Sequence, residues 1–390
     1  MNFVFLSPYF PLNYYRFCVA LKQAGATVLA IGDMPYDELR DELKLVLTEY
    51  YKVDDLHNRD QLRAACDHFI KHHGKIDRIE SHNEYWLETD AWLRTLYEVP
   101  GLKSDQMKLM KSKNGMKEAF TAAGVTVPRG QIVSDLAGME KFINQVGYPV
   151  IVKPDNGVGA SKTYRLNNVD DLTQFYTDFP DQPYIMEEFI EGQIHTFDGL
   201  VDSQGNVVFY TSHIYQDGIM ECVLDQLDVT FYSVRQVADD LTEAGKQSIT
   251  AFGITERFFH FEYFRKENGQ IVSLEANMRP PGGPILDMMN YANDINIYQE
   301  WANMVVTGQS NTHFYNPEMR KYFCAFVGRR DQKQYQASHD DIMNRYGTYI
   351  PCHEALPPVY ASAMGNYFYI VRAPNYETVA EIRSFILASA

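Results

Sequence analysis

The sequence predicts a mixed α/β protein with a doubly wound parallel sheet at its N-terminus and antiparallel sheets after it. Near the N-terminus, short apolar strands alternate with helical segments, which is typical of a parallel sheet with crossover helices. After residue 190 the strands follow one another more closely and are joined by turns, which favours antiparallel pairing. At 390 residues the chain is too long for one ordinary core, so we expect several subdomains.

Residues 1–110 are predicted to form the doubly wound domain. Strand and helix patterns alternate through this region, in the segments NFVFLS, FCVALKQAG, ATVLAIG, YKVDD, RDQLRAACDHFIKHHG and IDRIESHNE. The stretch Val99-Pro100-Gly101 is the first strong break, because proline and glycine interrupt regular structure.

Residues 111–190 are expected to form a second, smaller subdomain. Its first helix ends at Gly124, and its strand segments are VTVPRGQIV, YPVIVKP and PYIMEEFI. β-Branched and aromatic residues are common in these segments, as strands prefer.

The rest of the chain divides into two further regions. Residues 191–310 contain more strands, a long helix from about Arg235 to Phe252 and then a hairpin. Residues 311–390 form a C-terminal subdomain with helix and strand patterns of its own. The sequence leaves open whether this subdomain is a lid over a pocket or an oligomer contact.

Composition and charge exclude several classes of partner. A net charge of -16 argues against a nucleic-acid or anionic-membrane surface, which requires a concentrated positive field. No segment approaches the roughly 20 apolar residues that cross a bilayer, and MNFVFLSPYF lacks the features of a signal peptide. The five cysteines are scattered and never spaced as CxxC, as expected of a cytoplasmic protein without a zinc site.

A polar face on one predicted strand indicates a functional site. In SLEANMRPPGG, the residues Glu275, Asn277 and Arg279 occupy alternate positions, and alternate residues of a strand share one face. A carboxylate, an amide and a guanidinium do not stabilise a hydrophobic core. The prolines and glycines that follow cannot continue a helix or a sheet.

The preceding residues predict a hairpin that pairs this strand. Asn268-Gly269 is the dipeptide that a two-residue hairpin turn prefers, and such a turn would place Glu262 opposite Glu275. Like charges across a strand pair are destabilising unless a cation lies between them, and Mg²⁺ takes carboxylate oxygens together with substrate phosphates. The alternative is two solvated carboxylates on an exposed hairpin.

Two lysines could bind a phosphate group. Lys153 ends a buried strand, and a loop with Gly157, Gly159 and Ser161 follows it. Small residues let backbone N–H groups approach an anion closely. Such a loop could also be a plain turn, and Lys113, before an alanine-rich helix, could be a solvated surface lysine. The segment IMEEFIEG could be an edge strand or a connector whose backbone reads a purine.

Four signals occur in a fixed order along the chain. They are a lysine before a helix ending in Ala-Gly, a lysine in a PVIVKP strand with a glycine loop, the IMEEFIEG segment, and the hairpin ending in LEANMRPPGG. This set resembles the ATP-grasp superfamily of ADP-forming carboxylate–amine ligases, in its biotin carboxylase-like and L-amino acid ligase branches. The resemblance covers about residues 1 to 310 and implies that residues 111–190 form an ATP-binding lid.

The resemblance implies how the nucleotide is held. Lys113 and Lys153 would contact its phosphates, and the loop with Gly157, Gly159 and Ser161 would close over them. Glu187 would accept from the adenine amino group. The backbone of Glu188 and Ile190 would read the edge of the ring.

The resemblance also implies the metal ligands and the catalytic residue. Glu262, Glu275 and Asn277 would hold Mg²⁺, or Mn²⁺ in its place. Arg279 would hold the substrate carboxylate and then its acyl phosphate. One departure is that many relatives have a glutamate where this chain has Ile194. His195 or Asp198 could replace it, although His195 could equally be an ordinary strand histidine.

The activity that the resemblance implies is ATP-dependent formation of an amide or peptide bond. A small carboxylate, such as an amino acid, would be activated as an acyl phosphate and joined to an amine, with release of ADP and phosphate. Two alternatives stay open: a biotin carboxylase-like carboxylase that uses bicarbonate, and a non-catalytic nucleotide-binding regulator. The expected partners are these small molecules, and a homodimer is compatible with the resemblance.

Overall fold

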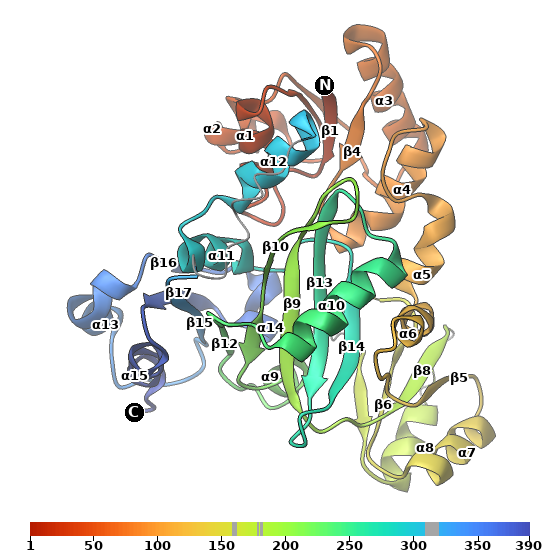
Figure 1. Ribbon diagram of the computed structural model, residues 1–390, viewed down its shortest axis with the longest axis vertical. Helices are drawn as coiled ribbons and strands as arrows, with labels where there is room; N and C mark the ends of the chain where they lie inside the picture. The colour runs from red at the N-terminus through yellow and green to blue at the C-terminus, as the bar shows by residue number, and fades with distance from the viewer. Residues whose placement is uncertain (158–161, 178, 180–181, 309–319) are drawn as a thin grey trace.

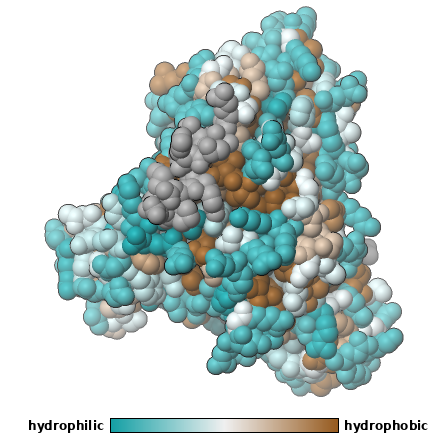
Figure 2. Space-filling view, viewed as in Figure 1, coloured by the Kyte–Doolittle hydropathy of each residue, from teal (hydrophilic) through white to brown (hydrophobic). Residues whose placement is uncertain are grey.

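The computed structural model describes residues 1–157, 162–177, 179, 182–308 and 320–390. Over these residues the chain forms three sheets, which occupy different parts of the molecule (Figure 1). We call them the N-terminal sheet, the small sheet and the large sheet. Figure 2 shows hydrophilic residues over most of the visible face and hydrophobic residues gathered near its centre. No helix in the described part of the chain has the length and apolar character needed to cross a membrane.

The N-terminal sheet is parallel, as the sequence predicts, with strand order β3-β2-β1-β4. Its elements are β1 (Asn2–Leu6), α1 (Tyr15–Gln23), β2 (Thr27–Gly32), α2 (Asp41–Lys44), β3 (Glu49–Lys52), α3 (Arg59–His73), β4 (Arg78–Glu80) and α4 (Leu87–Leu96). The apolar side chains of β1 and β2 are buried because helices cover the sheet.

The small sheet is antiparallel, with strand order β5-β8-β6-β7. Its region contains α5 (Met107–Lys111), α6 (Lys113–Ala122), β5 (Gly130–Val133), α7 (Leu136–Val146), β6 (Val150–Pro154), β7 (Tyr164–Leu166), α8 (Val169–Thr177) and β8 (Tyr184–Glu188). The strand expected from residue 125 begins only at Gly130. Thr126 instead bridges to Val272 of the large sheet, so the segment before β5 belongs to a different neighbour.

The large sheet has strand order β14-β13-β9-β11-β12-β15-β17-β16, with β10 paired to β9. Its strands are β9 (Gln193–Val201), β10 (Val207–Thr211), β11 (His213–Tyr215), β12 (Thr230–Ser233), β13 (Arg257–Arg265), β14 (Ile271–Asn277), β15 (Phe323–Arg329), β16 (Cys352–Ala355) and β17 (Tyr367–Ala373). The C-terminal strands therefore extend the sheet that carries the predicted polar face.

Helices cover the large sheet and connect it to the N-terminal domain. They are α9 (Ile219–Leu224), α10 (Asp239–Phe252), α11 (Ile285–Asn293), α12 (Ile297–Thr307), α13 (His339–Tyr346), α14 (Ala361–Met364) and α15 (Tyr376–Leu387). Figure 1 shows α12 beside α1, far from it in sequence. Trp301 of α12 packs edge-on against Phe3 and Phe17, with ring centroids 5.5 and 5.2 Å away. One core thus joins the two parts of the molecule.

The hairpin between β13 and β14 has the predicted pairing at its functional end but not at its turn. The two-residue turn is wrong: Arg265 pairs with Ile271, and only Gly269 of the expected dipeptide has a positive φ, of 84°. The N–H of Gly269 donates to the carbonyl of Lys266, which closes a longer loop. A register shift next to Glu262 then compensates, so Glu262 faces Glu275 as predicted.

Candidate active site

A cavity of about 390 Å³ lies between the small sheet and the β13–β14 hairpin. Its polar lining comes from α6, β6, β8, β13 and β14, and its apolar lining includes Phe189, Ile194 and Phe264. Nine of the residues predicted from the sequence line it: Lys113, Lys153, Glu187, Glu188, Ile190, Glu262, Glu275, Asn277 and Arg279. Residues far apart in the sequence thus meet in one concave site, as expected of a ligand pocket.

Two lysines hold Glu187 at one side of the cavity. Lys153 Nζ and Lys117 Nζ each lie 2.6 Å from a different carboxylate oxygen of Glu187. Burial alone would raise the pKa of Glu187, but the two ammonium groups outweigh it and lower the pKa to about 2. The sequence analysis missed Lys117, although it lies one helical turn after Lys113 on α6 and so shares a face with it.

The side chain of Lys113 lies between Gly157 and Glu275. Its Nζ is 3.5 Å from the carbonyl oxygen of Gly157 and 3.8 Å from Oε1 of Glu275. Its backbone N–H donates to the carbonyl of Asp155, so only its side chain is free to meet an anion. Gly157 does not line the cavity itself, and Gly159 and Ser161 lie outside the described residues.

Glu262, Glu275 and Asn277 present oxygen ligands on one stretch of the hairpin. Burial, together with the carboxylates of Glu84 and Glu262, raises the pKa of Glu275, although Lys113 acts in the opposite direction. Two acidic groups facing each other in a buried cavity repel unless a cation separates them. The amide of Asn277 is also buried and lies beside Glu275, with Nδ2 3.5 Å from its carboxylate.

This oxygen-only set fits Mg²⁺, which is commonly bound by one or two carboxylates together with substrate phosphates. The described residues contain no cluster of three or more His, Cys, Asp or Glu side chains with the geometry of a metal site. Two carboxylates and an amide therefore need further oxygens from a ligand. The site fits a metal that arrives with a nucleotide better than it fits a resident ion.

Arg279 also lines the cavity and is paired with Glu84. Its Nε and Nη2 lie 3.1 and 2.5 Å from Oε2 of Glu84, and its Nη1 donates to the carbonyl of Pro280. Burial would lower the pKa of Arg279, but Glu84 outweighs it and keeps the guanidinium charged. The sequence analysis missed Glu84. It lies in the turn after β4 of the N-terminal sheet, and no local pattern connects it to β14.

Glu188 and Ile190 lie on the apolar side of the cavity. The carboxylate of Glu188 binds the side chain of Arg129, with Nε 2.7 Å from Oε2, so it turns away from the cavity centre. The backbone N–H of Glu188 donates to the carbonyl of Arg129 and is not free to bind a ligand. Ile190 lines the cavity between the end of β8 and the start of β9, where its backbone belongs to no strand and could contact a nucleotide base.

The ATP-grasp domain family matches residues 146–287, which run from the end of α7 to the first turn of α11. This match identifies an ATP-grasp domain within the chain. The matched ATP-grasp domain contains Lys153, Glu187 and the whole hairpin, whereas Glu84 and Lys113 precede it.

Relatives of this ATP-grasp chain are carbon–nitrogen ligases. It is 24% identical to an L-arginine-specific L-amino acid ligase of Bacillus subtilis over 277 residues, which cover 67% of this chain and 65% of the ligase. It is 23% identical to the C-terminal section of the carbamoyl phosphate synthase large chain of Methanopyrus kandleri over 195 residues, or 46% and 35% of the two chains. The similarity thus spans less than two thirds of either relative.

Solved structures share the fold over nearly the whole chain. An L-amino acid ligase from Bacillus licheniformis has a TM-score of 0.77 at 15% identity, covering 99% of this chain and 96% of the ligase. An N5-carboxyaminoimidazole ribonucleotide synthetase in complex with ADP has a TM-score of 0.73 at 11% identity, covering 99% and 96%. At such identities the likeness establishes the ATP-grasp fold alone.

The structure does not bring His195 or Asp198 into the ATP-grasp cavity. Side chains alternate along β9, so Ile194 lines the cavity and His195 does not. Burial lowers the pKa of His195 to about 4. Asp198 is fully buried and lies 2.7 Å from Nδ1 of His213 and 2.5 Å from Nδ1 of His260.

His260 connects this buried group to the predicted metal ligands. It lines the cavity, and its Nε2 lies 3.4 Å from Oε1 of Glu262. The sequence analysis missed His213 and His260. The alternation FHFE places His260 on the same strand face as Glu262, and this spacing was the available signal.

Proposed function

We propose that this chain is an ATP-dependent, ADP-forming carboxylate–amine ligase that acts on an amino acid or another small carboxylate. One observation carries the proposal. Lys113, Lys153 and Arg279 line a single cavity together with the Glu262–Glu275 pair, and Nζ of Lys113 lies 3.8 Å from Oε1 of Glu275. Two lysines, a pair of facing carboxylates and a guanidinium in one cavity suit a metal–triphosphate next to a substrate carboxylate.

The nucleotide would lie between the small sheet and the hairpin. The apolar residues Phe189, Ile190 and Ile194 would enclose its base, and Lys113 and Lys153 would meet its phosphates. Glu187 would keep Lys153 in place, because their ion pair is buried. Glu262, Glu275 and Asn277 would hold Mg²⁺, with Mn²⁺ as a substitute. The metal would supply charge neutralisation between the phosphates.

The carboxylate substrate would lie near Arg279. A carboxylate resists attack by an amine because oxide is a poor leaving group. Transfer of the γ-phosphoryl group to a carboxylate oxygen gives an acyl phosphate and ADP. The amine then attacks the carbonyl carbon, and phosphate leaves with the oxygen that received it. Arg279 would hold first the carboxylate and then the acyl phosphate, so catalysis rests on positioning and electrostatic stabilisation.

Several further features belong to the same proposal. The name of the Bacillus subtilis relative supports an amino acid as one substrate. The net charge of -16 argues against a nucleic-acid partner, and the scattered cysteines without CxxC spacing support a cytoplasmic location. A homodimer is supported by the dimeric biotin carboxylase domain of Hydrogenobacter thermophilus, whose fold matches this chain with a TM-score of 0.71 at 16% identity, covering 97% of this chain and 88% of that domain.

The test is a matrix of amino acids, other small carboxylates and amines, each pair incubated with the chain, ATP and Mg²⁺. Phosphate release and the product mass are measured, and the nucleotide product is separated as ADP or AMP. Release of ADP and phosphate that requires both a carboxylate and an amine supports the proposal. AMP overturns the acyl-phosphate route, turnover that requires only bicarbonate favours the carboxylase alternative, and no turnover with any pair favours a regulator.

A further inference from the structure

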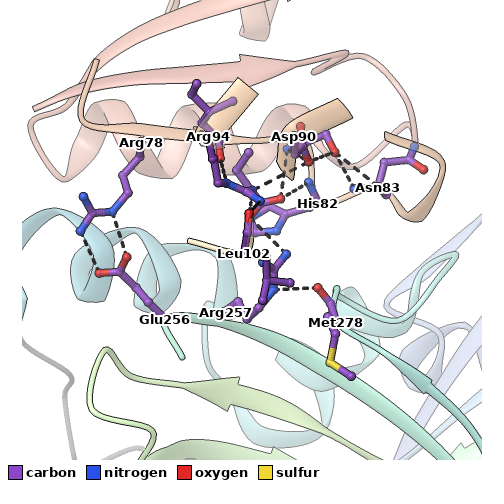
Figure 3. Close-up of polar contacts among 12 residues, drawn as sticks. Arg78, His82, Asn83, Asp90, Arg94, Leu102, Glu256, Arg257 and Met278 are labelled. Carbon is purple, nitrogen blue, oxygen red and sulfur yellow. Dashed lines mark hydrogen bonds and ion pairs between the residues drawn. The ribbon is translucent and has the colours of Figure 1, made fainter. Parts of the chain in front are cut away.

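A second cavity, of about 200 Å³, lies where the N-terminal domain meets the start of β13 and the helix α12. It shares no lining residue with the active-site cavity. Its apolar wall includes Phe3, Trp301 and Val305, and its polar wall consists chiefly of three arginines and two glutamates: Arg78, Arg94, Arg257, Glu80 and Glu256. Figure 3 shows Arg94 and Arg257 close together and, beside them, Arg78 paired with Glu256.

The two glutamates neutralise the three arginines only in part. Oε2 of Glu80 lies 2.9 Å from Nη2 of Arg94 and 3.3 Å from Nη2 of Arg257, so one carboxylate is shared by two guanidinium groups. Glu256 forms a two-pronged pair with Arg78 at 2.8 and 3.1 Å. The cavity wall therefore carries one more positive charge than negative charge.

Neighbouring titratable groups do not remove this excess. Asp90 lies 3.9 Å from Arg94, but its Oδ1 has no hydrogen-bond partner in the described structure. Burial and the charge of Glu80 raise the pKa of Asp90, which opposes a full negative charge on this carboxyl group. Burial also lowers the pKa of His82 to about 3, so this imidazole is neutral. A buried charge without a counter-charge is costly, so a bound anion would relieve it.

Arg257 has donors available for such an anion. It is 3% exposed, its Nε donates to the carbonyl of Met278 and its Nη2 donates to Glu80. Its Nη1 has no hydrogen-bond partner among the described residues, and Arg257 lines the cavity. At the cavity mouth, the side chains of Arg78 and Glu256 are 23% and 17% exposed, which gives solvent a route inward.

We propose that this cavity is a binding site for a small oxyanion, held by Arg257 and Arg78. Guanidinium groups recognise carboxylate and phosphate oxygens through paired N–H donors, and these bonds are strong where water is excluded. The cavity volume of about 200 Å³ is several times the roughly 30 Å³ that one water occupies in the liquid, so a small oxyanion fits inside. Free phosphate and the carboxylate of a small acid can both accept such paired N–H bonds.

The experiment is calorimetric titration of the full chain with phosphate and, separately, with acetate, at constant ionic strength set with chloride. Saturating ADP and Mg²⁺ are present, and the Lys153→Ala variant is titrated in parallel, so that binding at the active site is separated from binding at this cavity. The variants Arg78→Gln and Arg257→Gln are compared with Arg63→Gln. Arg63 is an exposed arginine outside the cavity, and its variant removes the same charge.

We expect phosphate or acetate to bind the wild type, the Lys153→Ala variant and the Arg63→Gln variant alike. The dissociation constant should rise at least tenfold in Arg78→Gln and Arg257→Gln. Binding of phosphate alone, or of acetate alone, identifies the source of the oxyanion. If Arg257→Gln fails to fold, Arg78→Gln at the mouth decides the question. Binding of neither anion, or wild-type affinity in Arg78→Gln, overturns the proposal.

Discussion

Arg279 donates to the carboxylate of Glu84 through Nε at 3.1 Å and through Nη2 at 2.5 Å, although the two residues are 195 positions apart. Glu84 follows β4 of the N-terminal sheet, and Arg279 follows β14 of the large sheet. The N-terminal domain thus holds a side chain that lines the cavity. These contacts use three of the five N–H donors of the guanidinium, so one N–H of Nη1 and one of Nη2 remain for a substrate carboxylate.

This pairing makes Arg279→Lys a test of the chemistry. Lysine keeps the positive charge but lacks the paired N–H donors of a guanidinium. Nucleotide affinity should therefore stay unchanged while kcat/KM falls roughly 30- to 1,000-fold, a loss of about 2 to 4 kcal/mol of transition-state stabilisation. Nucleotide affinity is measured by calorimetry, and turnover by phosphate release with the best substrate pair. The control is Arg129→Lys, because Arg129 also pairs with a glutamate but is exposed. A fully active Arg279→Lys variant would show that another residue holds the substrate carboxylate.

Lys153→Ala should weaken nucleotide binding without unfolding the chain. Lys117 still pairs with Glu187 in this variant, so no buried carboxylate is left alone. Loss of one charged hydrogen bond should raise the dissociation constant of a non-hydrolysable ATP analogue about 10- to 100-fold. The control is Lys141→Ala, on the exposed side of α7. Equal affinity of the two variants would remove Lys153 from the nucleotide site.

Glu262→Gln and Glu275→Gln should each raise the Mg²⁺ concentration required for half-maximal turnover, because each removes a charged ligand. Without metal, the melting temperature should hold or rise, since each substitution relieves the repulsion between the facing carboxylates. For Glu275→Gln this expectation has a second support, because burial and the nearby carboxylates of Glu84 and Glu262 disfavour the ionised form of Glu275 and raise its pKa. Calorimetric melting with and without Mg²⁺ measures both effects. A much lower melting temperature of both variants without metal would show that the carboxylates are structural.

Glu187 predicts a dependence of stability on pH. Lys153 and Lys117 outweigh burial and lower its pKa to about 2 in the folded chain, against about 4.3 when unfolded. Its ionised form therefore stabilises the fold above about pH 4.3, and this contribution is lost as the pH falls towards 2. The difference in unfolding free energy between wild type and Glu187→Gln should be on the order of 3 kcal/mol at pH 7 and should shrink below pH 4.3.

Urea unfolding at a series of pH values from 7 to about 3 measures this difference. The control is Glu140→Gln, at an exposed position of α7, which should show no such change with pH. A difference that stays constant across the series would mean that the buried pair of Glu187 with its lysines does not titrate as inferred.

The sequence by itself determined the fold class and most of the polar residues of the cavity. Strand alternation is a local property, so the shared face of Glu275, Asn277 and Arg279 could be read directly from their spacing. The position of Lys153 at the end of a buried strand could be read in the same way. The facing of Glu262 and Glu275 was predicted through a wrong turn, and a register shift in the strands restored it.

Only the tertiary structure decided which residues complete the site. Glu84 reaches Arg279, and Asp198 reaches His260, across distances in sequence that no local pattern spans. Such contacts depend on how the sheets pack against each other, and packing follows from the summed burial of many side chains rather than from any one segment. His195 shows the same limit, because the alternation of β9 allows either neighbour to face the cavity, and the packed sheet turns Ile194 towards it.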